Sequence, residues 1–385
     1  YDEMPYRGWE SVTVPGAVSA WVALSERFGK LPFADLFEPA IGYASDGFIV
    51  TPVIAELWRR AAEDLVHHPG FTETFLPNGK APKAGERFIN KPLAKTFQLI
   101  ARTNGEAFYK GALADAICDF ALEHGAVLSR EDMAAHKVDW CGTLSKKFDD
   151  LELHEIPPNG QGIAALMALG ILSHTRIRDL DSDDPLAIHL QVEAMKLALV
   201  DAETYVADDK YMTGVTSEVL LDETYLASRA ALIDEICAQD FNVGAPINGG
   251  TVYLTAADAS GMMVSFIQSN YAGFGSGVAI PGTGIAMQNR GAGFSLDPAS
   301  PNIVGPNKRP FHTIIPGFLM GPDGPLMSFG VMGGPMQAQG HVQMVLRTQV
   351  WGEDPQMAVE APRWRFIQGL KLACEDVMPA ATLEY

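Results

Sequence analysis

The chain has 385 residues, of which 47% are hydrophobic and 19% are charged. This balance excludes an intrinsically disordered protein, and the length allows one large domain or two to three average ones. The formal net charge of −19 disfavours nucleic acid and anionic membrane surfaces as electrostatic partners. No stretch reaches the roughly 18 apolar residues of a membrane span, so we expect neither nucleic acid nor a membrane as partner.

The chain starts at Tyr1 without an initiator Met, and its first residues lack the basic region and apolar run of a signal peptide. We therefore expect an incomplete N-terminus, and the compartment, cytoplasmic or periplasmic, stays open. The four cysteines form no CxxC pair and are expected to be inert buried thiols; they are Cys118, Cys141, Cys237 and Cys374.

The first half of the chain is predicted to be helical. Amphipathic or apolar runs separated by turn residues predict helices over residues 19–28, 33–46, 97–103 and 112–121. The pattern then changes, since residues 148–156 alternate loosely like a strand. A Pro-Pro-Asn-Gly turn follows at residues 157–160, and residues 163–172 form an apolar helix.

The longest predicted helix covers residues 185–206, with an apolar stripe on one face. The acidic residues before it superficially resemble a calcium loop, but Asp184 replaces the required Gly and Leu190 the required Glu. We interpret them as an acidic helix start. His189 and Glu193, one turn apart, are metal-ligand candidates, but a solvated helix pair is the favoured interpretation. No metal or other cofactor is expected.

Thr251 begins a predicted β-hairpin. Residues 252–257 and 262–269 have strand character and flank a turn at 258–261. If the turn is symmetric, Thr251 lies opposite Gln268, close to Ser269 and Asn270.

The residues before Thr251 suggest a cleavage site. Residues 242–250 are rich in Gly, Pro and Asn, which predicts an exposed, cleavable loop. Cleavage of the Gly250–Thr251 bond would give Thr251 a free α-amine beside its hydroxyl, and such an amine is a recognised activator of a threonine nucleophile.

Two glycine-rich segments follow. Residues 271–277 are too rich in glycine for a regular strand and lack the third Gly of the dinucleotide-binding pattern. Gly333 and Gly334 precede a helix predicted over residues 337–348. Adjacent glycines at such a junction can point backbone N–H groups at an oxyanion, although a simple turn is the alternative.

Taken in order, these motifs resemble the gamma-glutamyltranspeptidase family of N-terminal-nucleophile hydrolases. They comprise Gly250-Thr251, the hairpin, residues 273–277 and 305–310, and Gly333-Gly334, with residues 14–17 and 157–160 resembling large-subunit motifs. The resemblance covers nearly the whole chain. It implies an α+β fold, a four-layer αββα sandwich. A large-subunit portion (1–250) and a small-subunit portion (251–385) would associate in one interwoven domain.

The resemblance also implies roles for individual residues. Thr251 would be the nucleophile and its α-amine the general base, Ser269 would steady the hydroxyl, and Gly333 and Gly334 would form the oxyanion hole. An acyl-enzyme ester would form and then pass its acyl group to water or an amine.

The departures from the family pattern concern the substrate, a small-molecule amide. Arg290 and Gly293 replace a Gln and an Asp that hold the α-amino group in glutathione-cleaving members, and His312 and Thr313 replace a Ser pair on the α-carboxylate. Tyr271 matches a polar Asn, with Asn270 one residue away. Because an Arg can bind a carboxylate bidentately, an acyl group with an anion but no amine fits better, as in oxamate amidohydrolase-like and cephalosporin acylase-like members.

Other interpretations stay open at this stage. A structural ion pair is the less favoured alternative for Arg290, and His312 can equally be a buried hydrogen-bonding residue. The chain can also be a true glutathione hydrolase or gamma-glutamyltransferase. A different class is an uncleaved, non-enzymatic binding protein of the same fold.

Overall fold

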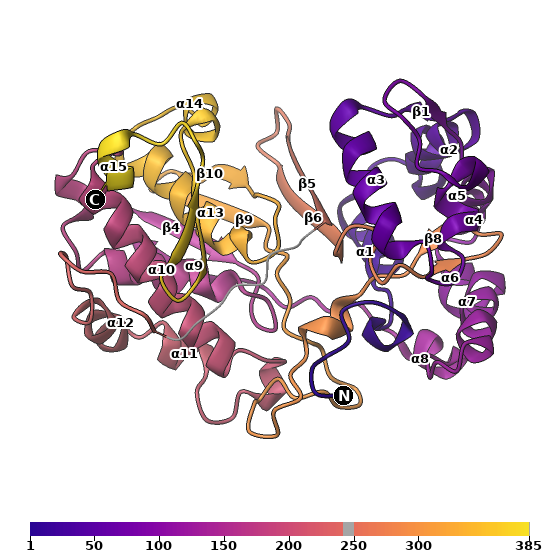
Figure 1. Cartoon of the computed structure of the whole chain (residues 1–385), viewed down its shortest axis with the longest axis horizontal. Coiled ribbons are helices and arrows are strands. Elements are labelled where there is room, and N and C mark those ends of the chain that lie inside the picture. The colour runs from indigo at the N-terminus through magenta and orange to yellow at the C-terminus, as the bar shows by residue number, and fades with distance from the viewer. Residues whose placement is uncertain (242–249, 385) are drawn as a thin grey trace. The chain divides into compact units, whose positions relative to one another are not determined.

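The structure is a computed structural model that describes residues 1–241 and 250–384 (Figure 1). The chain forms two compact units. The first unit contains Glu3–Trp140 and Asn270–Ala292, and the second contains Cys141–Ser269 and Gly293–Tyr385. The loop predicted over residues 242–250 lies, except for Gly250, outside the described residues.

The first unit is built mainly from helices. These are α1 (Ala17–Phe28), α2 (Glu38–Asp46), α3 (Pro52–Leu65), α4 (Phe71–Phe75), α5 (Lys91–Arg102), α6 (Glu106–Lys110), α7 (Ala112–Glu123) and α8 (Arg130–Ala135). Two short antiparallel pairs accompany them, β1 (Phe48–Ile49) with β2 (Arg87–Phe88) and β7 (Ala279–Ile280) with β8 (Ile285–Ala286).

The helices predicted in this unit are confirmed, with one shifted start. Helix α5 begins at Lys91, six residues before the predicted 97, because Asn90 caps it by accepting the N–H of Leu93 (3.1 Å). The residues predicted as one helix over 33–46 form a 3₁₀ turn (Phe33–Phe37) followed by α2.

Residues 270–292 contribute to the core of the first unit although they lie far along the chain. Val278, Ile280 and Met287 are buried in one apolar cluster with helical residues such as Ile117. Phe274 packs in a second, aromatic cluster, with its ring centroid 5.3 Å from that of Trp58. Burying such side chains contributes about 1.5–3 kcal/mol each, so this segment is an integral part of the unit.

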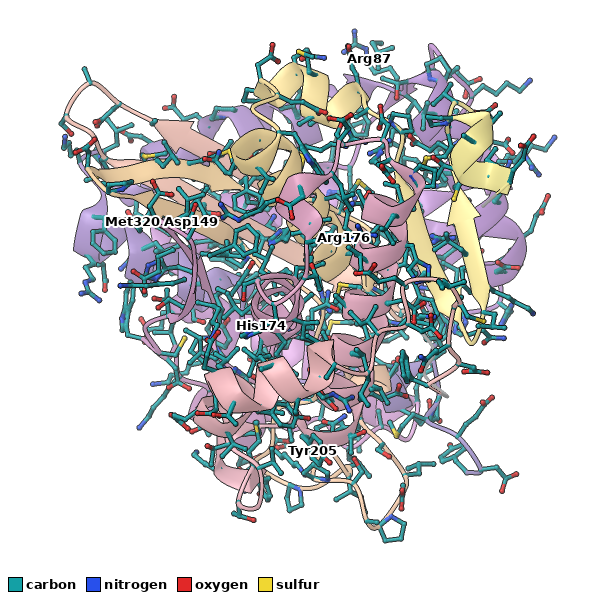
Figure 2. The ribbon with its side chains drawn as sticks, turned by 90° about the vertical axis from the view of Figure 1, so that its left-hand side faces the viewer. Arg87, Asp149, His174, Arg176, Tyr205 and Met320 are labelled. Atoms are coloured by element: carbon teal, nitrogen blue, oxygen red, sulfur yellow. The ribbon has the colours of Figure 1, made fainter. Side chains whose placement is uncertain are left out.

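The second unit contains a four-stranded antiparallel sheet in the order β10-β9-β4-β3. Its strands are β3 (Leu144–Phe148), β4 (Leu151–Glu155), β9 (Gly317–Gly321) and β10 (Gly324–Phe329). The single strand predicted over 148–156 is wrong in extent. A tight turn with Asp149 at a positive φ of 65° splits the region into the β3–β4 hairpin. Figure 2 labels Asp149 in this turn and Met320 in β9.

Helix α9 (Gly162–Leu172) packs on strands β3 and β4 of this sheet and on helices α10 (Pro185–Tyr205) and α13 (Met336–Val345). All eleven residues of α9 are buried, as expected for a helix that is apolar all round. The remaining elements of the unit are α11 (Ser217–Leu220), α12 (Glu223–Ala230), α14 (Pro355–Glu360), α15 (Ala380–Glu384), β11 (Trp364–Gln368) and β12 (Lys371–Cys374).

Helix α10 confirms one prediction and corrects another. Its acidic start is a cap, because the Asp184 carboxylate accepts the N–H of Leu186 (2.8 Å). The predicted solvated pair of His189 and Glu193 is wrong for Glu193. That carboxylate is fully buried and forms an ion pair with Lys196, which is 2% exposed.

The expectation of four buried cysteines is also wrong. Cys118 is buried, but Cys141 and Cys237 are exposed and Cys374 is partly exposed. Residue type alone does not decide burial here, because Cys141 and Cys237 lie outside the regular helices and strands. Among the described helices, none is both long and apolar enough to cross a membrane.

Candidate active site

Thr251 lies in strand β5 (Gly250–Ala257), which pairs with β6 (Met263–Tyr271). The hydroxyl of Thr251 donates a hydrogen bond to Oγ of Ser269 (3.1 Å). The structure therefore joins the predicted nucleophile to the residue predicted to steady it. Both side chains are partly buried.

The pairing of this hairpin differs from the symmetric turn predicted from the sequence. The N–H of Asp258 donates to the carbonyl of Met262 (3.1 Å), so three residues and not two form the loop. Gly261 takes a positive φ of 84°, and the Asp258 carboxylate accepts the N–H of Ser260 (2.8 Å), as is typical of three-residue hairpin loops. Counting back from Asp258 and Met262 places Thr251 opposite Ser269 rather than Gln268.

Strand β5 also runs beside β10 and the turn that follows it. Thr255 Oγ1 donates to the carbonyl of Ser328 (3.3 Å), and a Cβ on Gly330 would lie 2.6 Å from the Tyr253 ring. These two contacts place residues 253–255 beside residues 328–330, which precede the Gly333–Gly334 turn in the chain.

Gly333 and Gly334 form the turn between β10 and α13. Their φ angles are 126° and 62°, a region that favours glycine. The Gly333 carbonyl accepts the N–H of Met336 (3.3 Å), and the Gly334 carbonyl accepts that of Gln337 (3.0 Å). Among the described residues, the backbone hydrogen bonds of this turn use the two glycine carbonyls and not their N–H groups. Such a turn can present N–H donors to an anion.

His312 and Thr313 lie beside the turn that starts α9. The N–H of His312 donates to the carbonyl of Asn159 (3.1 Å), and the His312 carbonyl accepts the N–H of Gln161 (2.9 Å). A Cβ on Gly160 would lie 3.1 Å from Cε1 of His312. Thr313 is 4% exposed.

Gln161 was not predicted as a site residue, yet it connects two of the predicted segments. Its side-chain Nε2 donates to the carbonyls of Thr313 (2.7 Å) and Gly334 (2.9 Å). Gln161 is 1% exposed. The only sequence signal was its place in the turn before α9, which does not indicate such contacts.

The other three predicted residues, Asn270, Tyr271 and Arg290, belong to the first unit. The Asn270 carbonyl accepts the N–H of Asn289 (3.1 Å). The guanidinium carbon of Arg290 lies 5.0 Å from the centroid of the Tyr271 ring, within cation–π range. Tyr271 has a positive φ of 74°, and its ring makes an edge contact with that of Tyr6 at 5.8 Å.

Burial decides the electrostatics of this group. It lowers the pKa of Arg290 to about 10, against a smaller raising effect of Tyr271 and Tyr6. It also raises the pKa of Tyr271, which neighbouring Tyr6 raises further and Arg290 lowers. Arg290 is therefore a cation at neutral pH, and its guanidinium lies against the Tyr271 ring.

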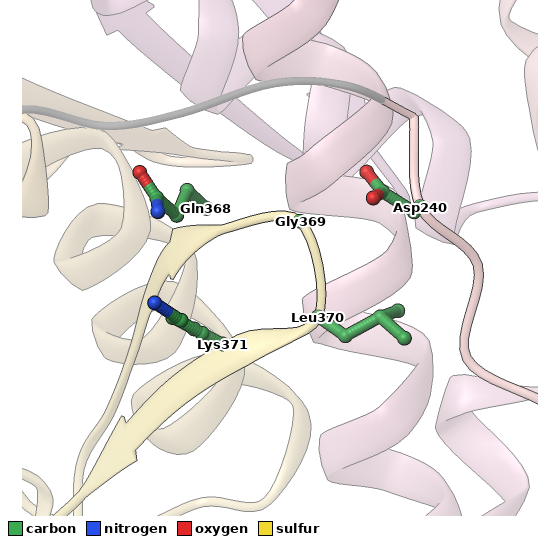
Figure 3. Close-up of a pocket in the computed structure, with 5 residues that line it drawn as sticks. All are labelled: Asp240, Gln368, Gly369, Leu370 and Lys371. Carbon is green, nitrogen blue, oxygen red and sulfur yellow. The ribbon is translucent and has the colours of Figure 1, made fainter.

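A shallow, open pocket lies elsewhere in the second unit, at the turn between β11 and β12 (Figure 3). Asp240, Gln368, Gly369, Leu370 and Lys371 line it. None of these is a predicted site residue, so this pocket does not carry the chemistry considered above.

Comparisons with known proteins agree on one family. A sequence model of gamma-glutamyltranspeptidase matches residues 1–385. The chain is 37% identical to the oxamate amidohydrolase proenzyme of Klebsiella pneumoniae over 367 residues, which is 94% of this chain and 69% of that protein. It is 35% identical to the glutathione hydrolase-like YwrD proenzyme of Bacillus subtilis over 362 residues, 94% of this chain and 68% of the relative.

Solved structures give the same result. The crystal structure of cephalosporin acylase from Bacillus halodurans superimposes with a TM-score of 0.92 at 44% sequence identity. The superposition covers 100% of this chain and 72% of that structure. The chain thus shares its mixed helix-and-strand fold with an acylase.

Proposed function

Because the chain belongs to the gamma-glutamyltranspeptidase family and is an enzyme acting on carbon–nitrogen amide bonds, we propose that it cleaves itself before Thr251 and then uses Thr251 as nucleophile. The observation that carries this proposal is the hydrogen bond from Thr251 Oγ1 to Ser269 Oγ (3.1 Å). This hydrogen bond directs the Thr251 hydroxyl proton toward Ser269. A lone pair on the other side of the Thr251 oxygen is then available for attack.

The self-cleavage that we propose is an N-to-O acyl shift. Thr251 Oγ adds to the carbonyl carbon of Gly250, the C–N bond breaks, and the released nitrogen takes the hydroxyl proton. Water then hydrolyses the resulting ester and leaves a carboxylate on Gly250 and a free α-amine on Thr251. Gly250 suits this step because a residue without Cβ leaves its carbonyl open.

Substrate turnover then uses the same acyl transfer to Thr251 Oγ, with the acyl group now supplied by a substrate molecule. The α-amine of Thr251 takes the proton from Oγ, which attacks the acyl carbonyl carbon and forms a tetrahedral oxyanion. The N–H groups of Gly333 and Gly334 stabilise this charge. The amine product leaves with the proton, and water attacks the acyl-enzyme to release the acid.

For the substrate, we propose a small amide whose acyl group carries a carboxylate. Arg290 is a cation beside Tyr271 and supports recognition of that carboxylate. Asn270, His312 and Thr313 would complete the binding residues. The relative named oxamate amidohydrolase fits this substrate class.

The same proposal includes the architecture after cleavage. The fragments 1–250 and 251–385 would stay together as large and small subunits of a four-layer αββα sandwich. The antiparallel sheet of the second unit, covered by α9 and the helices behind it, is consistent with part of that layering.

A denaturing gel combined with an amidase assay tests the proposal. The natural chain should yield two fragments and the Thr251→Ala variant one. The cleaved protein should hydrolyse oxamate or glutaryl amides faster than gamma-glutamyl amides. An intact natural chain, or a Thr251→Ala variant that still turns over these amides, would contradict the proposed nucleophile.

A further inference from the structure

Gln161 makes a pair of hydrogen bonds that link two segments of the proposed site. Its Nε2 lies 2.7 Å from the carbonyl oxygen of Thr313 and 2.9 Å from that of Gly334. Because both neighbours are acceptors, only the amide nitrogen can face them, and its two protons match the two oxygens. The side chain is 1% exposed, so water competes little for either carbonyl.

The backbone of Gln161 strengthens this link. Its N–H donates to the carbonyl of His312 (2.9 Å), and its carbonyl accepts the N–H of Ala164 in the first turn of α9 (2.9 Å). The residue is therefore fixed to α9 at one end and to the His312–Thr313 segment at the other. Its side chain has little freedom to move away from Gly334.

A second buried amide ties the same two segments together. Oε1 of Gln337, in the first turn of α13, accepts the N–H of Ile315 (3.2 Å). The Gly334 carbonyl thus receives the Gln337 N–H from one side and the Gln161 amide from another. These two donors restrict rotation about the Cα–C bond of Gly334. The conformation of the turn that contains both glycine N–H groups is restricted as a result.

We infer that Gln161 is a positioning residue, which locks the Gly333–Gly334 turn to the His312–Thr313 segment and keeps the oxyanion donors aimed. This inference rests on the proposed function. It concerns the acyl-transfer step, because donors that are already oriented stabilise developing charge without reorganisation. Gln161 itself need not touch the substrate.

The test uses the isosteric variant Gln161→Glu. A carboxylate places acceptors opposite two carbonyl oxygens and repels both. A matched control is Gln343→Glu in helix α13, the helix that follows the glycine turn. Gln343 is also buried, and its Nε2 also donates to two backbone carbonyls, those of Gln339 (3.2 Å) and Trp364 (3.1 Å). Both variants lose the same type of contact, but only Gln161 contacts the glycine turn.

We expect Gln161→Glu to lower kcat about 10- to 100-fold with a smaller change in KM. Gln343→Glu should keep kcat within about threefold of the natural enzyme at a comparable loss of thermal stability. Gln161→Met, which removes the donors without adding charge, provides a second measurement if Gln161→Glu does not fold. An unchanged kcat in the folded Gln161 variants, or an equal loss in Gln343→Glu, would overturn the positioning role.

The two proposals can fail separately. A parallel assay of the Thr251→Ala variant first establishes whether the measured activity depends on Thr251. If activity survived Thr251→Ala, the proposed nucleophile would be wrong. If activity depends on Thr251 but not on Gln161, only the positioning role is lost.

Discussion

At the scale of single residues, the proposed site centres on two hydroxyl groups. Thr251 Oγ1 donates to Ser269 Oγ across the β5–β6 hairpin at 3.1 Å. The value of this contact lies in orientation, since a neutral hydrogen bond contributes only about 0.5–1.5 kcal/mol to stability. A hydroxyl held in one rotamer presents the same lone pair to each acyl carbon, which is a gain in effective concentration.

The Ser269→Ala variant should therefore affect rates more than stability. We expect both self-cleavage and amide turnover to slow by about 10- to 100-fold, measured by gel densitometry and by initial rates. Ser265→Ala is the control in the same strand, because its hydroxyl contacts Tyr253 and the Gly317 carbonyl instead. Equal rates for Ser269→Ala and the natural chain would remove Ser269 from the mechanism.

Arg290 is the residue on which the predicted substrate class depends. Replacing it with Gln removes the cation but retains hydrogen-bonding capacity. We expect KM for carboxylate-bearing amides to rise about tenfold or more and KM for neutral amides to change little. Titration of both substrate types gives the comparison, and an unchanged ratio between them would show that Arg290 has a structural role.

The pH dependence of kcat/KM follows from two groups. The α-amine of Thr251 acts as a base only when neutral, so activity should rise with pH through its ordinary pKa of about 8. Burial lowers the pKa of Arg290 to about 10. If Arg290 binds the substrate carboxylate as proposed, this cation is lost above that pH and activity should fall. In Arg290→Gln the fall near pH 10 should disappear. If kcat/KM still falls near pH 10 in Arg290→Gln, a group other than Arg290 causes the fall.

At the scale of elements, the turn between β10 and α13 depends on glycine. Gly334 has a φ of 62°, where an L side chain costs about 1–2 kcal/mol. Gly334→Ala should shift the turn and lower kcat by about 100-fold. Gly142→Ala is the control, since Gly142 has a φ of 68° and an added Cβ would meet no other atom within 4 Å. Activity equal in the two variants would exclude the turn as the oxyanion site.

Helix α10 binds the chain close to the last residue described before position 242. Lys196 and Glu193 form a buried ion pair, Lys196 Nζ also donates to the Gln239 carbonyl, and the Gln239 N–H donates to Glu193 (3.3 Å). Residue 239 is therefore held at the surface of α10, three residues before the segment that leads to Gly250.

Lys196→Met should destabilise the protein because it leaves the Glu193 charge buried without its cation. The expected loss in unfolding free energy is about 3–5 kcal/mol, measured by urea denaturation. Lys210→Met, at an exposed position, is the control and should change stability by less than about 0.5 kcal/mol. A loss below about 1 kcal/mol in Lys196→Met would mean that the pair is not the anchor.

At the scale of the whole molecule, each unit combines segments from both sides of the Gly250–Thr251 bond. Residues 270–292 pack in the core of the first unit with residues before 140, and residues 141–241 share the second unit with 251–269 and 293–385. Cleavage of one bond removes no core contact from either unit.

The two fragments should therefore remain associated after cleavage. For this chain of 41.5 kDa, we expect both fragments to elute in one peak in native size exclusion and to give two bands on a denaturing gel. Separation of the fragments should require unfolding by denaturant, since buried clusters in both units hold them. Fragments that separate in buffer would contradict this interwoven arrangement.

Local sequence patterns were sufficient wherever a structure depends on near neighbours. Helices α1, α7, α9 and α10 lie within about two residues of their predicted bounds, because apolar periodicity and caps act over a few residues. The roles proposed for Thr251, Ser269 and the Gly333–Gly334 pair come from the family resemblance that the order of the motifs carries. The sequence by itself thus determined the family, the reaction type and the nucleophile that we propose.

Only the tertiary structure decided the relations between distant residues. The Asp258 turn shifted the hairpin register by one, so that Ser269 faces Thr251. The ion pair with Lys196 explains why Glu193 is buried. The role proposed for Gln161 rests on hydrogen bonds to residues 152 and 173 positions away. The physical reason is the same in each case: a hydrogen bond or ion pair depends on positions in space, and the folded chain sets these independently of local pattern.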